Sequence, residues 1–150
     1  MKPPFHKSAF VHSLGGKIYV NTIVRTVDGW GAGISSVSVV SASDPAAVGL
    51  AVLSALAASV DDAPNEINPK ESVAALLKAS GIRSWSQFMS KTKMLIAWQE
   101  PAYNVINLTP TRYLGRSKGS AHLNEKSINC AADSAASLGS AIFHAIGLCE

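Results

Sequence analysis

The sequence predicts an α/β sandwich of the α+β class, with mostly antiparallel sheet and helices packed on one or both of its faces. Short β-favouring runs joined by glycine-containing turns alternate with amphipathic helical segments, in the order βββα–αα–βββα. A strand-then-helix unit occurs twice, at Val37–Leu56 and at Lys126–Ile146. The chain of 150 residues suits a single domain, residues 1–150, that can bury a sizeable core.

The two strand-then-helix units share a helical pattern. Val48-Gly49-x-Ala51 in the first helix matches Leu138-Gly139-x-Ala141 in the second, 90 positions later (139 − 49). The pattern favours a divergent internal duplication, with similar halves at about 1–62 and 84–150 joined by a helical connection. Chance similarity between two helices rich in alanine and serine is the alternative.

The first half is expected to form a three-stranded meander followed by a helix. A glycine pair turns a first strand, Phe5–His12, into the β-branched run Lys17–Val27. The loop Asp28–Gly33 leads to a third strand, Ile34–Ser41. Asp44-Pro45 then starts a helix, because aspartate caps free N–H groups and proline suits the first turn. The apolar stripe of this helix should lie on the sheet: Val48, Val52, Leu53, Leu56 and Val60.

The second half is expected to begin with two short helices after the polar connection Asp61–Asn68. Asn68-Pro69-Lys70-Glu71 resembles a capping box for the first helix, and Gly81 ends it. Ser84 repeats the capping pattern for a short helix that carries Trp85, Phe88 and Met89. The remaining segments are predicted to be two hairpin strands, a long loop, a strand and a final helix: Lys93–Trp98, Tyr103–Tyr113, Leu114–Asn124, Glu125–Cys130 and the helix from Ala135.

The composition excludes several classes of protein. With 47% hydrophobic and 15% charged residues, the chain is typical of a globular protein and not of a disordered one. No run approaches the roughly 20 apolar residues of a membrane span, and the N-terminus lacks the apolar core of a signal peptide. The cysteines, Cys130 and Cys149, have no metal-ligand spacing and fit a reducing compartment. We therefore expect a cytoplasmic protein without membrane contact.

No catalytic or metal-binding pattern stands out. The four histidines lack the short spacing of zinc sites. Gly29, Gly31 and Gly33 do not fit the dinucleotide fingerprint, and a strand rather than a helix is predicted to follow them. No nucleophile-elbow motif supports a serine triad, although triads assemble from distant residues. We predict a binding protein and not an enzyme, with no catalytic residue, cofactor, metal or small-molecule substrate; a hydrolase with a triad invisible in sequence stays an alternative.

Positive charge concentrates around one loop of the second half, at Arg112, Arg116, Lys118 and Lys126. Its glycines and serines would suit phosphate contact. Few aromatic side chains are interleaved there, and the net charge of +3 falls short of a nucleic-acid footprint. A solvated loop is the simpler interpretation, and we do not expect a nucleic-acid partner.

Negative charge is concentrated in the segment Asp61–Glu71, which holds four of the ten acidic residues of this net-basic chain. It is either a solvated linker with a helix-capping glutamate or a docking patch for a basic partner, since complementary charge speeds encounter and sets partner choice. Trp30 either packs at a hairpin end or serves as an exposed anchor. The predicted partner contacts are Asp61, Asp62, Glu66, Glu71 and Trp30.

An ordered series of residues runs through the second half. It begins with Ser84-Trp85 and Phe88, continues in the strand Ile106–Arg112 with Leu114-Gly115-Arg116 behind it, and closes with Ala145–Cys149. In this order the residues resemble the immunity proteins of bacterial contact-dependent growth inhibition systems. The first half resembles them only loosely.

The resemblance implies a small cytoplasmic inhibitor that binds the C-terminal toxin domain of a large surface-displayed protein in a one-to-one complex. Toxins of such systems are often nucleases, including tRNA-cleaving ones, and inhibition is by binding alone. We therefore expect a toxin-neutralising immunity protein. The alternative from another class is an RNA-binding accessory domain that uses the basic loop 112–118.

Overall fold

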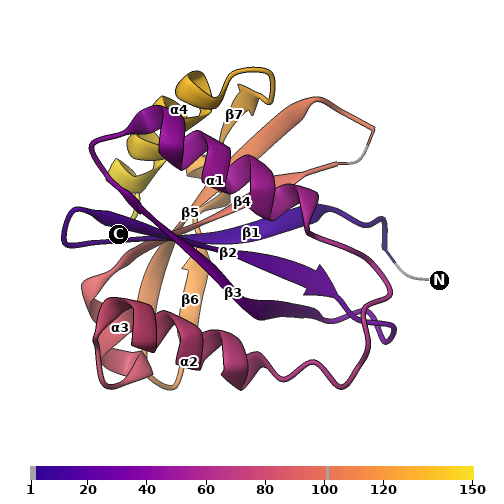
Figure 1. The fold of residues 1–150 in the computed structure, drawn as a ribbon, viewed down its shortest axis with the longest axis vertical. Helices are drawn as coiled ribbons and strands as arrows, with labels where there is room; N and C mark the ends of the chain where they lie inside the picture. The colour runs from indigo at the N-terminus through magenta and orange to yellow at the C-terminus, as the bar shows by residue number, and fades with distance from the viewer. Residues whose placement is uncertain (1–2, 101) are drawn as a thin grey trace.

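The computed structural model describes residues 3–100 and 102–150, which form a seven-stranded sheet with two helices packed on each face (Figure 1). Every strand pair in this part of the chain is antiparallel, which confirms the predicted fold class. In chain order the elements are β1 (Lys7–Leu14), β2 (Lys17–Arg25), β3 (Gly31–Ser41), α1 (Pro45–Ala57), α2 (Pro69–Ser80), α3 (Trp85–Lys91), β4 (Lys93–Gln99), β5 (Val105–Gly115), β6 (Gly119–His122), a 3-10 turn (Asn124–Lys126), β7 (Ile128–Ala131) and α4 (Ala135–Gly147).

The two halves of the chain form one continuous sheet, a point that the sequence pattern alone did not decide. The strand order is β3-β2-β1-β4-β5-β6, and β7 pairs with the other end of β5. β1 and β4 meet in the middle, where Val11 lies opposite Leu95. Strands of the first half therefore occupy one side of the sheet, and strands of the second half occupy the other.

The helices begin at residues whose side chains satisfy free backbone N–H groups. Asp44 accepts a hydrogen bond from the N–H of Ala47 at α1, and Asn68 accepts one from Lys70 at α2. Ser84 does the same for Gln87 at α3. All three starts agree with the predicted ones, because capping depends on residues that are neighbours in sequence.

The main core lies between the sheet and the helices α1 and α4, which are above the sheet in Figure 1. Side chains that alternate along the strands point into it, as expected for a sheet with different layers on its two faces. Its fully buried members include Val11, Ile18, Val20, Val48, Val52, Leu56, Leu95, Ile106, Leu108, Leu138 and Ile142.

A second, smaller core fills the opposite face, between the sheet and the helices α2 and α3, which are below the sheet in Figure 1. Phe88 of α3 is its centre and is fully buried. Tyr19, Leu76, Met89 and Met94 complete the buried set. Among the described residues, no helix is long and apolar enough to cross a membrane.

Several predicted segments have different bounds in the structure. α1 ends at Ala57, so Val60 lies outside the helix and is 49% exposed. The carbonyl of Val60 accepts a hydrogen bond from the N–H of Arg25, the last residue of β2. The predicted long loop 114–124 instead holds the end of β5 and the strand β6, which pair with each other. The predicted strand 125–130 starts later, as β7, because the 3-10 turn occupies 124–126.

Candidate functional site

The acidic segment and the loop of Trp30 meet at one end of the molecule. Ala63 forms a short parallel bridge with Thr26, just beyond β2, and its carbonyl accepts from the N–H of Val27. The side chain of Asn65 accepts from the N–H of Asp28, which ties the connection between α1 and α2 to the β2–β3 loop. The structure therefore brings together segments that the sequence suggested separately. We call the loop that carries Trp30 and the segment Asp61–Glu71 together the acidic end.

Asp61 forms a bidentate intramolecular ion pair with Arg25. The Nε atom of Arg25 lies 2.8 Å from Oδ1 of Asp61, and Nη2 lies 2.6 Å from Oδ2. Asp61 raises the pKa of the Arg25 guanidinium, mainly through side-chain hydrogen bonding. Arg25 also donates to the carbonyl of Pro3 and lies over the ring of Phe5. The pair therefore fixes the acidic end to the N-terminal segment.

The other predicted contacts are placed where a partner could reach them. Trp30 is 38% exposed, in keeping with an anchor that is partly supported by its own loop. Asp62, Glu66 and Glu71 are exposed, and Glu71 lies in the first turn of α2. A carboxylate in the first turn also complements the helix dipole. The acidic end thus carries three exposed carboxylates and one partly exposed tryptophan.

The basic loop is partly neutralised by the last residue of the chain. Glu150 binds Lys126 with an Nζ–Oε2 distance of 2.6 Å, and Arg112 lies 3.7 Å from its other oxygen. These contacts, chiefly the hydrogen bond from Lys126, lower the pKa of the Glu150 carboxyl. Arg116 and Lys118 remain exposed at the turn between β5 and β6.

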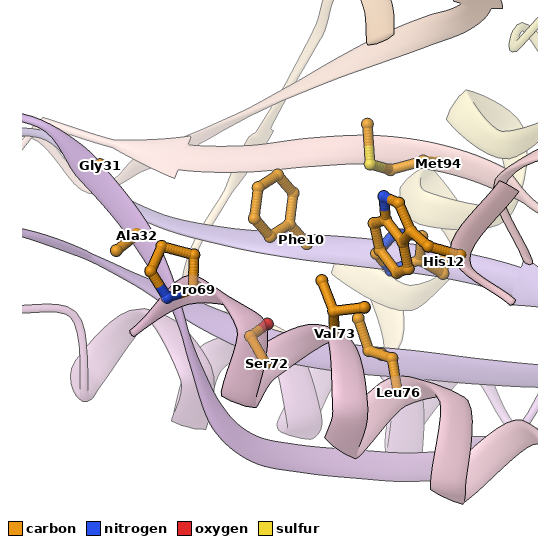
Figure 2. Close-up of a pocket in the computed structure, with 11 residues that line it drawn as sticks. Phe10, His12, Gly31, Ala32, Pro69, Ser72, Val73, Leu76 and Met94 are labelled. Atoms are coloured by element: carbon orange, nitrogen blue, oxygen red, sulfur yellow. The ribbon is translucent and has the colours of Figure 1, made fainter. Parts of the chain in front are cut away.

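A pocket of about 200 Å³, which we call the His12 pocket, opens between the sheet and the helices α2 and α3. Figure 2 shows Val73 and Leu76 projecting from α2 toward the strands that carry Phe10, His12 and Met94. Segments from five elements therefore build a hollow with mostly apolar walls. The full lining is Phe10, His12, Gly31, Ala32, Gly33, Pro69, Ser72, Val73, Leu76, Trp85 and Met94.

His12 is the polar exception in this pocket. It is 1% exposed, and neither ring nitrogen has a hydrogen-bond partner. Burial lowers the pKa of the imidazole from 6.5 to about 3, so the ring is neutral near pH 7. Its neighbours are aromatic: the ring centroids of Phe88, Phe10 and Trp85 lie 5.0, 6.0 and 6.2 Å away.

The approach of α2 to the sheet depends on a small residue in β3. A Cβ atom on Gly33 would lie 2.7 Å from Oγ of Ser72 and 3.0 Å from Nδ2 of Asn21. The Asn21 amide donates to Ser72 at 2.9 Å, and this buried hydrogen bond joins β2 to α2. These contacts fix the helix that forms one wall of the pocket.

The sequence predictions missed this site. From the sequence, His12 is expected at the end of a strand, and the histidines are considered only as metal ligands or members of a triad. Trp85 and Phe88 are assigned to a short helix and to the residue series that resembles the immunity proteins. The available indication was the alternation of Phe10 and His12, which places both side chains on one face of a strand. Nothing local indicated that α2, α3, β3 and β4 would close around that face.

A second hollow, of about 420 Å³, shares Trp85 with the pocket. Its other lining residues are polar or amphipathic: Ser84, Ser86, Tyr113 and Arg116. Trp85 is 36% exposed, and its ring stacks on Phe88 with centroids 5.2 Å apart. An apolar pocket and a polar surface therefore share one aromatic edge.

Cys130 and Cys149 are both free thiols, and burial raises the pKa of each. Within the part of the chain that the structure describes, no three histidine, cysteine, aspartate or glutamate side chains are placed to hold a metal ion.

Comparison with known proteins identifies the fold. No family model matches the chain, and no curated protein matches it. A protein of unknown function from Neisseria meningitidis, NMB0488, superposes with a TM-score of 0.78 at 15% identity, covering 100% of this chain and 99% of that one. A chain of the CdiA-CT/CdiI toxin and immunity complex from Yersinia pseudotuberculosis superposes with a TM-score of 0.75 at 14% identity, covering 97% and 98%. At these identities the likeness is one of fold.

Proposed function

We propose that this chain is an immunity protein, which binds and neutralises the C-terminal toxin domain of a contact-dependent growth inhibition system. The observation that supports the proposal most strongly is the likeness in fold to a chain of a toxin and immunity complex, over 97% of this chain. The likeness extends over both halves, whereas the residue series of the sequence covers the second half. The two observations rest on different properties of the chain.

Inhibition by such a protein needs binding and no chemistry. The proposed complex is one-to-one and cytoplasmic, and requires no cofactor. An escaped toxin molecule harms the cell, so the complex should be tight; nanomolar affinity corresponds to about 12 kcal/mol. An interface of roughly 1,600 Å² with a few anchoring side chains is typical for such pairs.

The acidic end is proposed as one part of this interface. Trp30 would be the apolar anchor, and Asp62, Glu66 and Glu71 would meet basic groups of the toxin. Asp61 contributes through its ion pair with Arg25, which holds the segment in place. This arrangement suits a nuclease toxin, including one that cleaves tRNA, because proteins that bind a phosphate backbone carry basic surfaces.

Co-purification tests the proposal directly. The chain should be produced together with the C-terminal domain of the large surface protein encoded beside it. A stable one-to-one complex is the expected result. Recovery of the two proteins as separate species at micromolar concentrations would contradict the proposed function.

A second candidate function is RNA binding at the basic loop. The structure adds an observation in its favour, because Trp85 and Tyr113 lie beside Arg116 and could stack on bases. The contacts of Glu150 with Arg112 and Lys126 weigh against it. RNA retention that falls steeply with added salt would support this function, and no retention at low salt would exclude it.

A further inference from the structure

We propose that the His12 pocket receives one tyrosine side chain of the protein partner, with the ring between the apolar walls and the hydroxyl on the imidazole of His12. The inference rests on the proposed function and deepens it, because it names the side chain that the partner inserts. It also adds a contact region that adjoins the acidic end, since Gly31 and Pro69 line the pocket.

The size of the pocket selects a single ring. Pockets for drug-sized ligands measure about 300 to 1,000 Å³, whereas an apolar cavity of about 150 Å³ holds one benzene molecule. The His12 pocket, at about 200 Å³, lies between these and suits a ring with one substituent. Its walls are aliphatic and aromatic, including Phe10, Val73, Leu76 and Met94.

The chemistry of His12 selects a hydroxyl on that ring. A neutral imidazole offers one N–H donor and one acceptor nitrogen, and neither is used here. A buried polar group without a partner is costly, so a ligand that supplies one gains binding energy. His12 is 1% exposed, so its ring has to turn toward the pocket for the hydroxyl to reach a nitrogen. A phenol hydroxyl can donate or accept, and a buried tyrosine usually finds such a partner. Phenylalanine would leave the imidazole unsatisfied.

The surroundings of the pocket favour a protein as the source of the ring. Trp85 forms the edge between the pocket and the polar hollow of Ser84, Ser86 and Arg116. An apolar anchor pocket beside a polar, solvated rim is the arrangement found at protein interfaces. A free small molecule would use the pocket and leave the hollow empty.

Titration of the isolated chain with phenol and with toluene tests the chemistry, because the two probes differ only in hydroxyl versus methyl. NMR resonances of the His12 ring and the Trp85 indole should shift with both probes. Phenol should bind about fivefold more tightly, the factor that one net hydrogen bond supplies. His12→Phe should abolish this preference while the fold persists. Unmoved resonances, or equal affinity for the two probes in the wild type, would overturn the inference and leave a pocket occupied by water.

A pocket-filling variant tests the source of the ring. Val73→Phe places a ring of the chain itself in the pocket, and Val39→Phe makes the same change at an exposed position of β3. Val73→Phe should weaken the toxin complex at least tenfold, mainly by faster dissociation, and Val39→Phe should not. Circular dichroism would verify that both variants fold.

The two tests separate this inference from the proposed function. If Val73→Phe binds the toxin with wild-type affinity, the toxin does not insert a tyrosine into the pocket. Binding of phenol would then assign the pocket to a free phenolic ligand. A wild-type chain that does not bind the toxin would refute the proposed function and this source of the ring together. The phenol titration would then still decide whether the pocket recognises a hydroxyl-bearing ring.

Discussion

Gly49 of α1 and Gly139 of α4 contact each other's helix in the same way. A Cβ atom on Gly49 would lie 1.8 Å from the carbonyl oxygen of Ala135, and one on Gly139 would lie 1.8 Å from that of Pro45. Ala135 and Gly139 follow Pro45 and Gly49 by 90 positions (135 − 45 and 139 − 49). The helix crossing is therefore reciprocal, with the two backbones touching where no side chain intervenes.

Gly49→Ala and Gly139→Ala should each destabilise the protein, because the methyl group meets backbone that cannot move aside. Overpacking of this kind costs about 1 to 3 kcal/mol or more. Urea unfolding followed by circular dichroism measures the loss. Gly147→Ala is the matched control, since nothing lies within 4 Å of its added Cβ, and it should be neutral or slightly stabilising. Equal stability of all three variants would show that the helices do not touch at these positions.

His12 should make the fold sensitive to acid. Its pKa is about 3 in the folded protein against 6.5 when unfolded, so the unfolded state binds more protons between these values. The contribution of the neutral imidazole is complete above pH 6.5 and is lost at about 1.4 kcal/mol per pH unit as the pH falls toward 3.

The free energy of unfolding, measured from pH 7 to pH 4, checks this dependence. His12→Phe should show a flatter profile than the wild type. His122→Gln, which removes an exposed imidazole from β6, is the control and should keep the steeper one. Identical profiles for His12→Phe and the wild type would contradict a buried neutral imidazole.

The ion pair between Arg25 and Asp61 should hold the acidic end in place. Asp61→Asn removes the negative charge and one of the two acceptors for Arg25, so the melting temperature should fall. The decrease in melting temperature should become smaller as salt is added. Amide exchange should quicken at Val27, whose N–H bonds the carbonyl of Ala63. Unchanged exchange there would show that the backbone bonds alone fix this segment.

Charge reversal at the acidic end should slow association with the toxin. Glu66→Lys and Glu71→Lys together should lower the association rate roughly tenfold at low salt and much less at high salt. Asp61→Lys and Asp62→Lys should also weaken the complex, although the first breaks the pair with Arg25 as well. Stopped-flow kinetics measures the rates.

Glu125→Lys, in the 3-10 turn at the other edge of the sheet, is the matched control. It should leave the association rate nearly unchanged. If Glu125→Lys slows association as much as Glu66→Lys or Glu71→Lys alone, the effect is one of net charge, and the acidic end is not the docking patch.

More of the fold than of the candidate site could be predicted from the sequence. Helix starts at Asp44, Asn68 and Ser84 could be predicted because capping is local, and the strands could be predicted from β-branched runs. Val60 and β6 could not, because their positions are decided by pairing with β2 and β5. Local sequence does not specify such long-range partners.

The same limit explains the predicted contacts. Negative charge in Asp61–Glu71 was visible in the sequence, but the engagement of Asp61 depends on Arg25, which lies 36 positions earlier. The His12 pocket needs five elements to close it, so no short segment could indicate it. The acidic residues could accordingly be proposed as partner contacts from the sequence, and that stays a prediction, whereas the burial of His12 could not be foreseen.

Growth rescue is the measurement that tests the central claim most directly. The toxin domain encoded beside this chain would be expressed inside cells with the wild-type chain, with the Glu66→Lys and Glu71→Lys double variant, or with neither. Immunity predicts that cells with the toxin alone stop growing, that the wild-type chain restores growth, and that the variant restores less. Growth arrest that persists with the wild-type chain, at levels matching the toxin, would contradict it.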